Sequence, residues 1–244
     1  MTSSTVRTAP AERCALAVLA RNEHTGLMTL HPTIPWDGFD QYFLIDGGST
    51  DGTFELALAH RIPSFRQSFP GLGAAMMEAR SRCEVDALVF FHPDGNEKPQ
   101  DTLVIRDLLR AGHPFVVASR MLPAAHNEED DRLWRPRKLA NLAFAAFANA
   151  LWARDGTRTS DVTNGLRGIT TAVWDHLDLT STDCTLDYQM VIRALKRGVP
   201  IHEFPTQEGQ RIAGQTNFPS WRTGLAELRL LLSEIRASLA PQPQ

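Results

Sequence analysis

Short apolar runs alternate with segments of helical pattern along this chain, and the alternation restricts it to a few folds. Runs that predict buried strands cover residues 14–20, 41–45, 86–91, 115–119, 167–170 and 201–204. Helical patterns follow at residues 54–60, 72–82, 99–110, 138–154, 187–197 and 225–239. Repeated strand, turn and helix are typical of a mostly parallel sheet covered on both faces. The sequence therefore predicts a single Rossmann-like α/β domain, with a mixed sheet flanked by helices and an amphipathic helix at its C-terminal end.

The folded domain is expected to span residues 14–239. A chain of 244 residues is long enough for one large domain, and no internal repeat or linker divides it. Residues 1–13 and 240–244 are expected to be disordered. A loop at residues 122–135 interrupts the alternation of strands and helices. Its acidic run, Glu128–Asp131, is interpreted as a solvated face.

Charge, cysteine content and hydropathy exclude several classes of protein. The formal net charge of −3 offers no basic surface for nucleic acid. Cys14, Cys83 and Cys184 are too scattered for a metal site or a disulfide framework, which favours a reducing cytoplasm. No run reaches the roughly 18–20 apolar residues of a membrane span. The nearest run, Leu139–Ala153, contains two asparagines and predicts a core helix or a surface-lying one.

Two predicted strands end in acidic turns, at Asp46-Gly47-Gly48 and at His92–Asn96. Ligands of open α/β sheets bind at the carboxyl ends of strands, where glycine lets the backbone approach a ligand closely. A carboxylate there can accept hydrogen bonds from a base or ribose, or can hold Mg²⁺ or Mn²⁺, which prefer oxygen ligands. Asp-Gly turns are also common loop signals, so neither turn establishes a site by itself.

Seven short motifs follow one another in a fixed order between residues 14 and 218. They are AVLARNE at 17–23, LIDGGSTDGT at 44–53, GLGAA at 71–75, FHPDGNEKP at 91–99, VASR at 117–120, SDVTNGLR at 160–167, and EFP at 203–205 with Arg211, Gly214, Gln215 and Thr216. In this order the motifs resemble those of family 2 glycosyltransferases, and among them the dolichol-phosphate mannosyltransferase-like branch. The resemblance implies a GT-A fold, a nucleoside-diphosphate-sugar donor and inversion at the anomeric carbon.

The resemblance also implies roles for individual residues. The residues that would hold the donor nucleotide and sugar are Leu19, Arg21, Glu23, Asp46, Gly71, Pro93 and Asp94. Those that would hold a Mg²⁺ or Mn²⁺ ion are Asp94, Asn96 and His92. Those that would form the catalytic centre are Asp94, Arg120, Asp161 and Arg211, the arginines because their planar forks bind phosphate oxygens. The acceptor side would be shaped by Asp161, Thr163 and Arg167.

The motifs also have plainer interpretations, and the sequence departs from the family's pattern. Without the resemblance, Arg120 and Arg211 could equally be surface residues, and Glu23 and Asp161 could cap local segments. His92 stands where the family has the first aspartate of its metal motif, and one carboxylate fewer weakens the hold on a hard cation. Three further departures are Leu19 for proline, Arg21 for tyrosine and Gly47 for the second aspartate of the first motif. Asn217 replaces a lysine that the family often has near the phosphates, which weakens the case for a phosphate acceptor.

The leading prediction is transfer of a hexose or N-acetylhexosamine from a nucleoside-diphosphate sugar to a polyprenyl phosphate. The enzyme would be cytoplasmic, with peripheral contact at the inner membrane face. A phosphate acceptor is already ionised, whereas a hydroxyl acceptor needs a general base, for which Asp161 and Asp187 are the candidates. The alternatives are a soluble transferase that acts on a small molecule or saccharide, and a degenerate, non-catalytic nucleotide-sugar binder. A dehydrogenase is disfavoured because no Gly-x-Gly-x-x-Gly follows the first strand.

Overall fold

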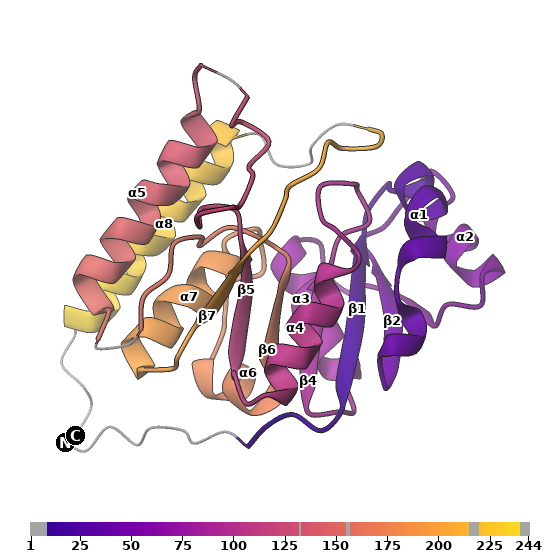
Figure 1. Cartoon of the computed structure of the whole chain (residues 1–244), viewed down its shortest axis with the longest axis horizontal. Helices are drawn as coiled ribbons and strands as arrows, with labels where there is room; N and C mark the ends of the chain where they lie inside the picture. The colour runs from indigo at the N-terminus through magenta and orange to yellow at the C-terminus, as the bar shows by residue number, and fades with distance from the viewer. Residues whose placement is uncertain (1–8, 132, 155–156, 215–219, 240–244) are drawn as a thin grey trace.

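A seven-stranded mixed sheet forms the centre of the computed structural model, which describes residues 9–131, 133–154, 157–214 and 220–239 (Figure 1). The strands are β1 (Cys14–Ala20), β2 (Gln41–Asp46), β3 (Ser64–Arg66), β4 (Ala87–Phe91), β5 (Phe115–Ser119), β6 (Arg167–Thr170) and β7 (His202–Pro205). Their order is β3-β2-β1-β4-β6-β5-β7, and β6 runs antiparallel to both of its neighbours. The order reverses between β1 and β4, which creates the kind of crevice where such sheets bind ligands.

Alternate residues of β1 face two separate hydrophobic cores. Ala15, Ala17 and Leu19 belong to one core, whereas Leu16 and Val18 belong to the other. All seven residues of the strand are buried, because helices cover both faces of the sheet. This arrangement explains why the strand reads as a continuous apolar run and does not alternate with polar residues.

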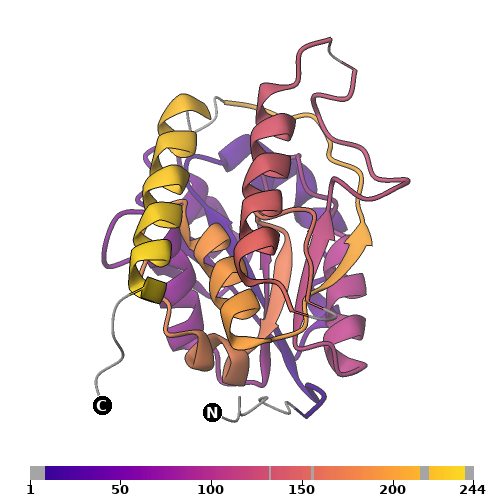
Figure 2. The same cartoon turned by 90° about the vertical axis from the view of Figure 1, so that its left-hand side faces the viewer.

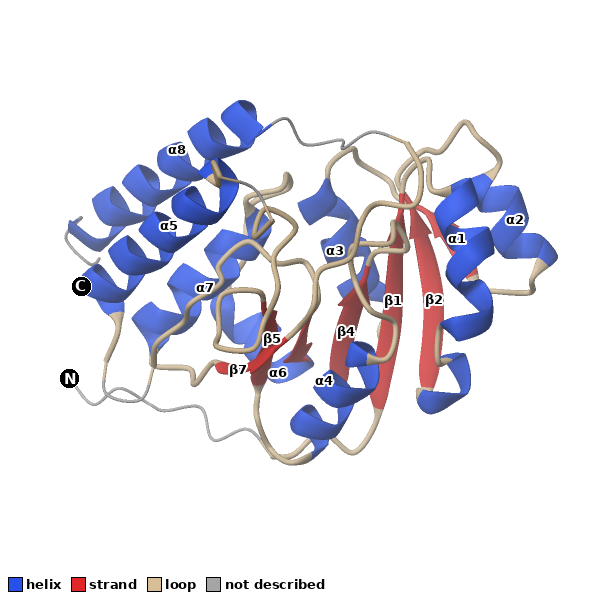
Figure 3. Ribbon diagram, turned by 45° about the horizontal axis from the view of Figure 1, so that its top comes forward, coloured by secondary structure: helices blue, strands red, loops and turns tan. Residues whose placement is uncertain are grey.

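Helices form the outer layers on both faces. They are α1 (His24–Leu30), α2 (Thr53–Ala59), α3 (Leu72–Arg82), α4 (Asp101–Arg110), α5 (Pro136–Trp152), α6 (Thr171–Leu177), α7 (Leu186–Arg197) and α8 (Ser220–Leu239). Helices α1, α2 and α4 cover one face, and α3, α6 and α7 cover the other (Figure 3). Helices α5 and α8 both contact α7 and are the outermost elements on that side (Figure 2). None of the described helices combines the length and hydropathy that crossing a membrane requires.

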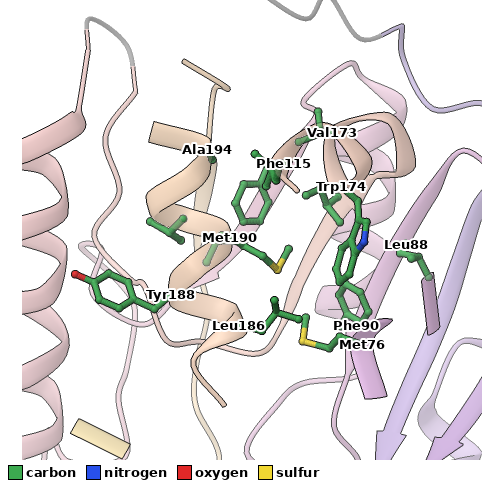
Figure 4. Close-up of a cluster of buried hydrophobic side chains, with 14 of the residues drawn as sticks. Met76, Leu88, Phe90, Phe115, Val173, Trp174, Leu186, Tyr188, Met190 and Ala194 are labelled. Carbon is green, nitrogen blue, oxygen red and sulfur yellow. The ribbon is translucent and has the colours of Figure 1, made fainter. Parts of the chain in front are cut away.

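The larger core lies between the sheet and helices α3, α6 and α7 (Figure 4). The ring of Phe90 from β4 packs on Trp174 from α6, with 5.7 Å between ring centroids and a tilt of 41°. Tyr188 of α7 belongs to the same core but points away from these two rings (Figure 4), and its hydroxyl donates to the carbonyl oxygen of Phe144 at 3.0 Å. This hydrogen bond gives the buried hydroxyl a partner and fastens α5 to α7.

The predicted α/β fold is confirmed, and most predicted elements agree with the structure within one or two residues. Helix α8 begins at Ser220, five residues before its predicted start. The prediction missed α1, α6 and the three-residue strand β3, which are too short to show a clear hydrophobic period. Residues 1–8 and 240–244, which were expected to be disordered, lie outside the described residues.

Two predicted disordered or solvated segments are packed. Ala11 is buried, and its amide donates to the Leu109 carbonyl oxygen at 3.2 Å, so residues 9–13 are attached to the domain. The acidic run, which was interpreted as a solvated face, instead packs against the N-terminal turn of α5. Glu129 is buried and accepts a hydrogen bond from the Lys138 amide at 3.0 Å, and Asp130 forms an ion pair with the Lys138 side chain. Carboxylates at a helix N-terminus are stabilised by the helix dipole, which gives the acidic run a structural purpose.

We expect Phe90→Ala to lower the free energy of unfolding by about 3–5 kcal/mol, because it leaves a cavity beside Trp174. Urea denaturation followed by circular dichroism measures the loss. Phe147→Ala on α5 is the matched control, since Phe147 is 58% exposed and should change stability by less than about 1 kcal/mol. Equal losses in the two variants would contradict the assignment of Phe90 to the core.

Candidate functional site

A cavity of about 780 Å³ lies at the carboxyl edge of the sheet. Its walls come from the segments that follow β1, β2, β4, β5 and β7. The turn before β6 joins them, because this antiparallel strand begins at the edge where the parallel strands end. The segment after β3, the starts of α3 and α7, the first turns of α5 and the first two turns of α8 complete the lining. The reversal of strand order between β1 and β4 thus places one cavity where the sequence predicted the ligand.

Most residues of the predicted site line this cavity. They are Leu19, Arg21, Glu23, Gly71, His92, Asp94, Asn96, Arg120 and Arg211. Thr163 lines it too, as the resemblance to an acceptor side implied. The structure thus brings together residues that are separated by up to 192 positions in the sequence, from Leu19 to Arg211.

Asp46 and Pro93 do not line the cavity. Asp46 is fully buried, and its carboxylate accepts hydrogen bonds from the amides of Gly48 and Ser49, each at 3.1 Å. It therefore stabilises the turn after β2, and its contact with a nucleotide stays a prediction. The carbonyl oxygen of Pro93 lies against α1, where a Cβ added to Gly26 would come within 2.1 Å of it. Gly71 has a packing reason of its own, since at φ +121° it lets the Thr182 carbonyl approach within 2.1 Å of where a Cβ would be.

Arg211 crosses the cavity from the segment after β7 to the segment after β1. Its Nη1 and Nη2 atoms lie 2.7 and 2.9 Å from Glu23 Oε1, and Nη1 lies 3.4 Å from Asp94 Oδ2. Burial raises the pKa of Glu23 to about 7, although Arg211 acts in the opposite direction. Arg211 is therefore neither isolated nor at the surface: it is a cation between two carboxylates, with the forked geometry that binds phosphate oxygens.

The turn after β4 presents oxygen atoms that fit a divalent cation. The backbone amide of Asn96 donates to Asp94 Oδ1 at 2.9 Å, which stabilises the turn that carries both side chains. The Asn96 Oδ1 atom is buried and has no hydrogen-bond partner. Carboxylate and amide oxygens suit Mg²⁺ or Mn²⁺, with substrate phosphates completing the coordination. In the described part of the chain no three His, Cys, Asp or Glu side chains gather into a site of their own.

His92, the third residue expected at the metal, forms a buried pair with Glu97. Its Nδ1 lies 2.8 Å from Glu97 Oε1, and its backbone amide donates to Glu97 Oε2 at 2.7 Å. Burial by itself would lower the pKa of His92, but the Glu97 and Asp94 carboxylates raise it to about 9. The Nε2 atom of His92 is buried and has no hydrogen-bond partner among the described residues, so its role at a metal stays a prediction. Glu97 was missed as a site residue, although it lies within the same motif.

Arg120 is held by a buried network instead of facing solvent. Its Nε and Nη2 atoms donate to the two oxygens of Asp161 at 2.8 and 2.9 Å, and Nη1 donates to Glu208 Oε1 at 3.0 Å. Burial alone would raise the pKa of Asp161, but Arg120 holds it below its ordinary value. Asp161 is fully buried and does not line the cavity. This carboxylate anchors Arg120 and has no free oxygen with which to act as a base.

The wall opposite β1 carries two further carboxyl groups. Asp187, a candidate base from the sequence, lines the cavity and lies 3.0 Å from Nε of the fully buried Arg167. Glu227 on α8 also lines the cavity and is 5% exposed. No motif marks Glu227, because it lies beyond the last motif, which ends near residue 218. Asn217, Gln215 and Thr216 lie outside the described residues.

Two curated proteins are similar to this chain in sequence, and both are glycosyltransferases. Glycosyltransferase AglJ of Haloferax volcanii is 30% identical over 194 residues, which cover 77% of this chain and 60% of that protein. Polyprenol monophosphomannose synthase of Mycolicibacterium smegmatis is 28% identical over 184 residues, which cover 70% of this chain and 67% of that protein. The chain thus spans about 60% of the length of the first of these relatives. No family model matches the chain.

Solved structures of glucosyl-3-phosphoglycerate synthase from Mycobacterium tuberculosis have the same fold. The complex with Mn²⁺, UDP and glucosyl-3-phosphoglycerate has a TM-score of 0.65 at 18% identity, over 97% of this chain and 84% of that chain. The complex with Mn²⁺, UDP and phosphoglyceric acid has a TM-score of 0.67 at 19% identity, over 96% and 81%. Another complex of the same enzyme holds Mg²⁺ and UDP. These neighbours confirm the predicted GT-A fold.

We expect Asp161→Ala to lower the free energy of unfolding by about 3–5 kcal/mol, because the Arg120 guanidinium would remain buried without its main partner. Chemical denaturation measures the change. Asp107→Ala is the matched control: that side chain is 63% exposed beside Arg106, and its loss should cost less than about 1 kcal/mol. If the two variants were equally stable, the network of Arg120 and Asp161 would not contribute to the stability of the fold.

Proposed function

We propose that this protein is a glycosyltransferase that moves a sugar from a nucleoside-diphosphate donor. The observation that carries the proposal is the cluster of Asp94, Asn96 and Arg211 in the cavity at the strand-order reversal. This cluster combines oxygen ligands for a cation with a guanidinium for phosphates. The sequence relatives are glycosyltransferases, and the structural neighbour is a synthase crystallised with UDP, which supports the same conclusion.

The donor nucleotide is assigned to the end of the cavity beside β1, β2 and α3. Leu19, Ile45 and Leu72 line this end and offer apolar surface for a base. Arg21 follows β1, and no described residue forms an ion pair with it, so its charge is available to the donor. The proposed diphosphate position lies between Arg21 and Arg211, next to Asp94.

The reaction is a displacement at the anomeric carbon of the donor sugar, with the nucleoside diphosphate as leaving group. Negative charge grows on the diphosphate as the bond breaks, so groups that stabilise this charge more in the transition state increase the rate. A bound Mg²⁺ or Mn²⁺ ion, held by Asp94 and Asn96, would supply electrostatic stabilisation of that charge. Arg211 contributes a second cation, and the ion pair of Glu23 with Arg211 orients its fork.

The acceptor is assigned to the other end of the cavity, between the starts of α5 and α8. A polyprenyl phosphate is one candidate, and the name of the relative from Mycolicibacterium smegmatis favours it. An apolar surface beside the cavity would suit the lipid and a peripheral membrane contact. Trp221 lines the cavity and is 69% exposed, and Leu225 and Leu228 on α8 are 40% and 43% exposed. The other candidate is a hydroxyl of a small molecule or saccharide, since the structural neighbour was crystallised with phosphoglyceric acid.

We expect one of GDP, UDP or dTDP to bind to the protein with Mn²⁺ present, and Asp94→Ala to weaken that binding at least about tenfold. The carboxylate would no longer help to hold the ion and the diphosphate, and about 1.4 kcal/mol corresponds to a factor of ten. Titration calorimetry with each nucleotide, with and without Mn²⁺, measures the effect.

Asp175→Ala is the control for this experiment, because Asp175 forms an ion pair with Arg80 away from the cavity. If the wild-type protein bound none of the nucleotides, the donor assignment would be wrong. Binding of a nucleotide sugar with no transfer to any acceptor and no hydrolysis would instead favour the degenerate, non-catalytic binder.

A further inference from the structure

Almost all charged groups that line the cavity are paired with a group of opposite charge. The pairs are Glu23 and Asp94 with Arg211, His92 with Glu97, Arg120 with Glu208, Glu128 with Arg137, and Asp187 with Arg167. Among the described residues of the lining, Arg21 and Glu227 have no ion-pair partner. They lie at different ends: Arg21 follows β1 at the donor end, and Glu227 belongs to α8 at the acceptor end.

The Glu227 carboxyl group lies between α8 and the elements beneath it. The titratable groups that face it are Asp187 and Tyr188 of α7, Cys184 before α7, and Arg120 after β5. Arg120 is already bound to Asp161 and Glu208. No described residue donates a hydrogen bond to Glu227. Glu227 is 5% exposed, but its carboxyl oxygens are not among the fully buried side-chain atoms that lack a partner, so the group that lines the cavity is turned toward the space where an acceptor would bind.

We propose that Glu227 is the general base of this site and that the acceptor is therefore a hydroxyl group. The assignment rests on the glycosyltransferase function proposed above. The acceptor oxygen forms a bond to the anomeric carbon of the donor sugar, while the bond from that carbon to the diphosphate oxygen breaks. The electrons of the broken bond leave with the nucleoside diphosphate, and the hydroxyl proton passes to the Glu227 carboxylate.

The environment of Glu227 suits proton transfer near neutral pH. Burial raises the pKa of Glu227 to about 7; the Asp187 carboxylate adds to this effect and Arg120 opposes it. A general base works best when its pKa lies close to the pH of the reaction. The other candidate bases are less available, because Asp161 is bound to Arg120 and Asp187 lies against Arg167.

The same two carboxyl groups disfavour a phosphate acceptor. A polyprenyl phosphate is already ionised and needs no base. It would have to bring its negative charge next to Glu227 and Asp187, and the nearest arginines, Arg120 and Arg167, already have carboxylate partners. An uncharged hydroxyl meets no such repulsion and can donate a hydrogen bond to the carboxylate.

The experiment compares wild type, Glu227→Gln and Glu227→Asp over pH 5.5–9. The donor is the sugar nucleotide whose nucleotide binds in calorimetry. The acceptors are water, glycerol as an uncharged hydroxyl compound, and a short polyprenyl phosphate in detergent. We expect the wild-type rate with a hydroxyl acceptor to rise with pH and level off above about 7, because the carboxylate form is the active one. Glu227→Gln should be slower by about 10²–10⁴-fold and lack the rise, and Glu227→Asp should keep it at a reduced rate. Nucleotide binding should be unchanged in both variants.

Glu78→Gln is the matched control, since Glu78 on α3 is paired with Arg82 and does not line the cavity. It should keep the wild-type pH profile.

Thermal melting checks the fold. Glu227→Gln should have a higher melting temperature than wild type at pH 8.5, where wild type must bury a charge, and a similar one at pH 5. A Glu227→Gln enzyme with the wild-type rate and pH profile would overturn the assignment, and so would transfer to the polyprenyl phosphate alone. Failure of the wild-type protein to bind any nucleotide would overturn the proposed function first, and this assignment with it.

Discussion

The buried ion pair of Arg120 with Asp161 is the interaction on which the acceptor half of the site depends. Arg120 follows β5, Asp161 precedes β6, Glu208 follows β7, and Asn141 of α5 donates to Asp161 Oδ1 at 3.0 Å. These four segments are distant in the sequence, and the network joins them just beyond the point where β5 pairs with β6 and β7. Two charges removed from water attract strongly only when their remaining donors and acceptors are satisfied, and here they are. The network therefore fixes the wall of the cavity while leaving its interior open.

Charge pairing also explains how one cavity can hold many ionisable groups without a large net field. The described lining contains carboxylates from six segments, and most of them are neutralised by an arginine or by His92. A diphosphate can enter only if it finds a cation that is unpaired or can be shared. Arg21 is unpaired, and Arg211 already divides its fork between Glu23 and Asp94. Selectivity for the donor then depends on the few cations that are unpaired or shared, and not on the total number of charged groups in the cavity.

The fold could be predicted from the sequence more completely than the contacts within the site. Strand β1 and helix α3 were predicted at their observed bounds, because each has a strong local signal: a continuous apolar run in one, an alanine-rich segment without proline in the other. Asp94 and Arg211 were predicted through motifs. The partners of these residues were not, since the pairing of Arg120 with Glu208 joins positions 88 residues apart and follows only from the packed structure. Asp46 was also placed through a motif, but the motif did not show that its carboxylate accepts hydrogen bonds from the turn that follows it.

Helix α8 carries both features that bear on the identity of the acceptor: an apolar outer face and the Glu227 carboxyl group. Its inner face carries Leu230 and Leu231, which are buried against α7, and Glu234, which forms ion pairs with Arg193 and Lys196 at 2.9 and 2.6 Å. These contacts anchor the helix independently of Glu227, so Glu227 is not needed to hold it. The outer face carries exposed leucines, and an apolar face could suit a lipid. Apolar surface is, however, non-directional and fits many neighbours, whereas an unpaired buried carboxylate is costly and fits few. The more specific of the two features lies inside the cavity, and it favours a hydroxyl over a phosphate.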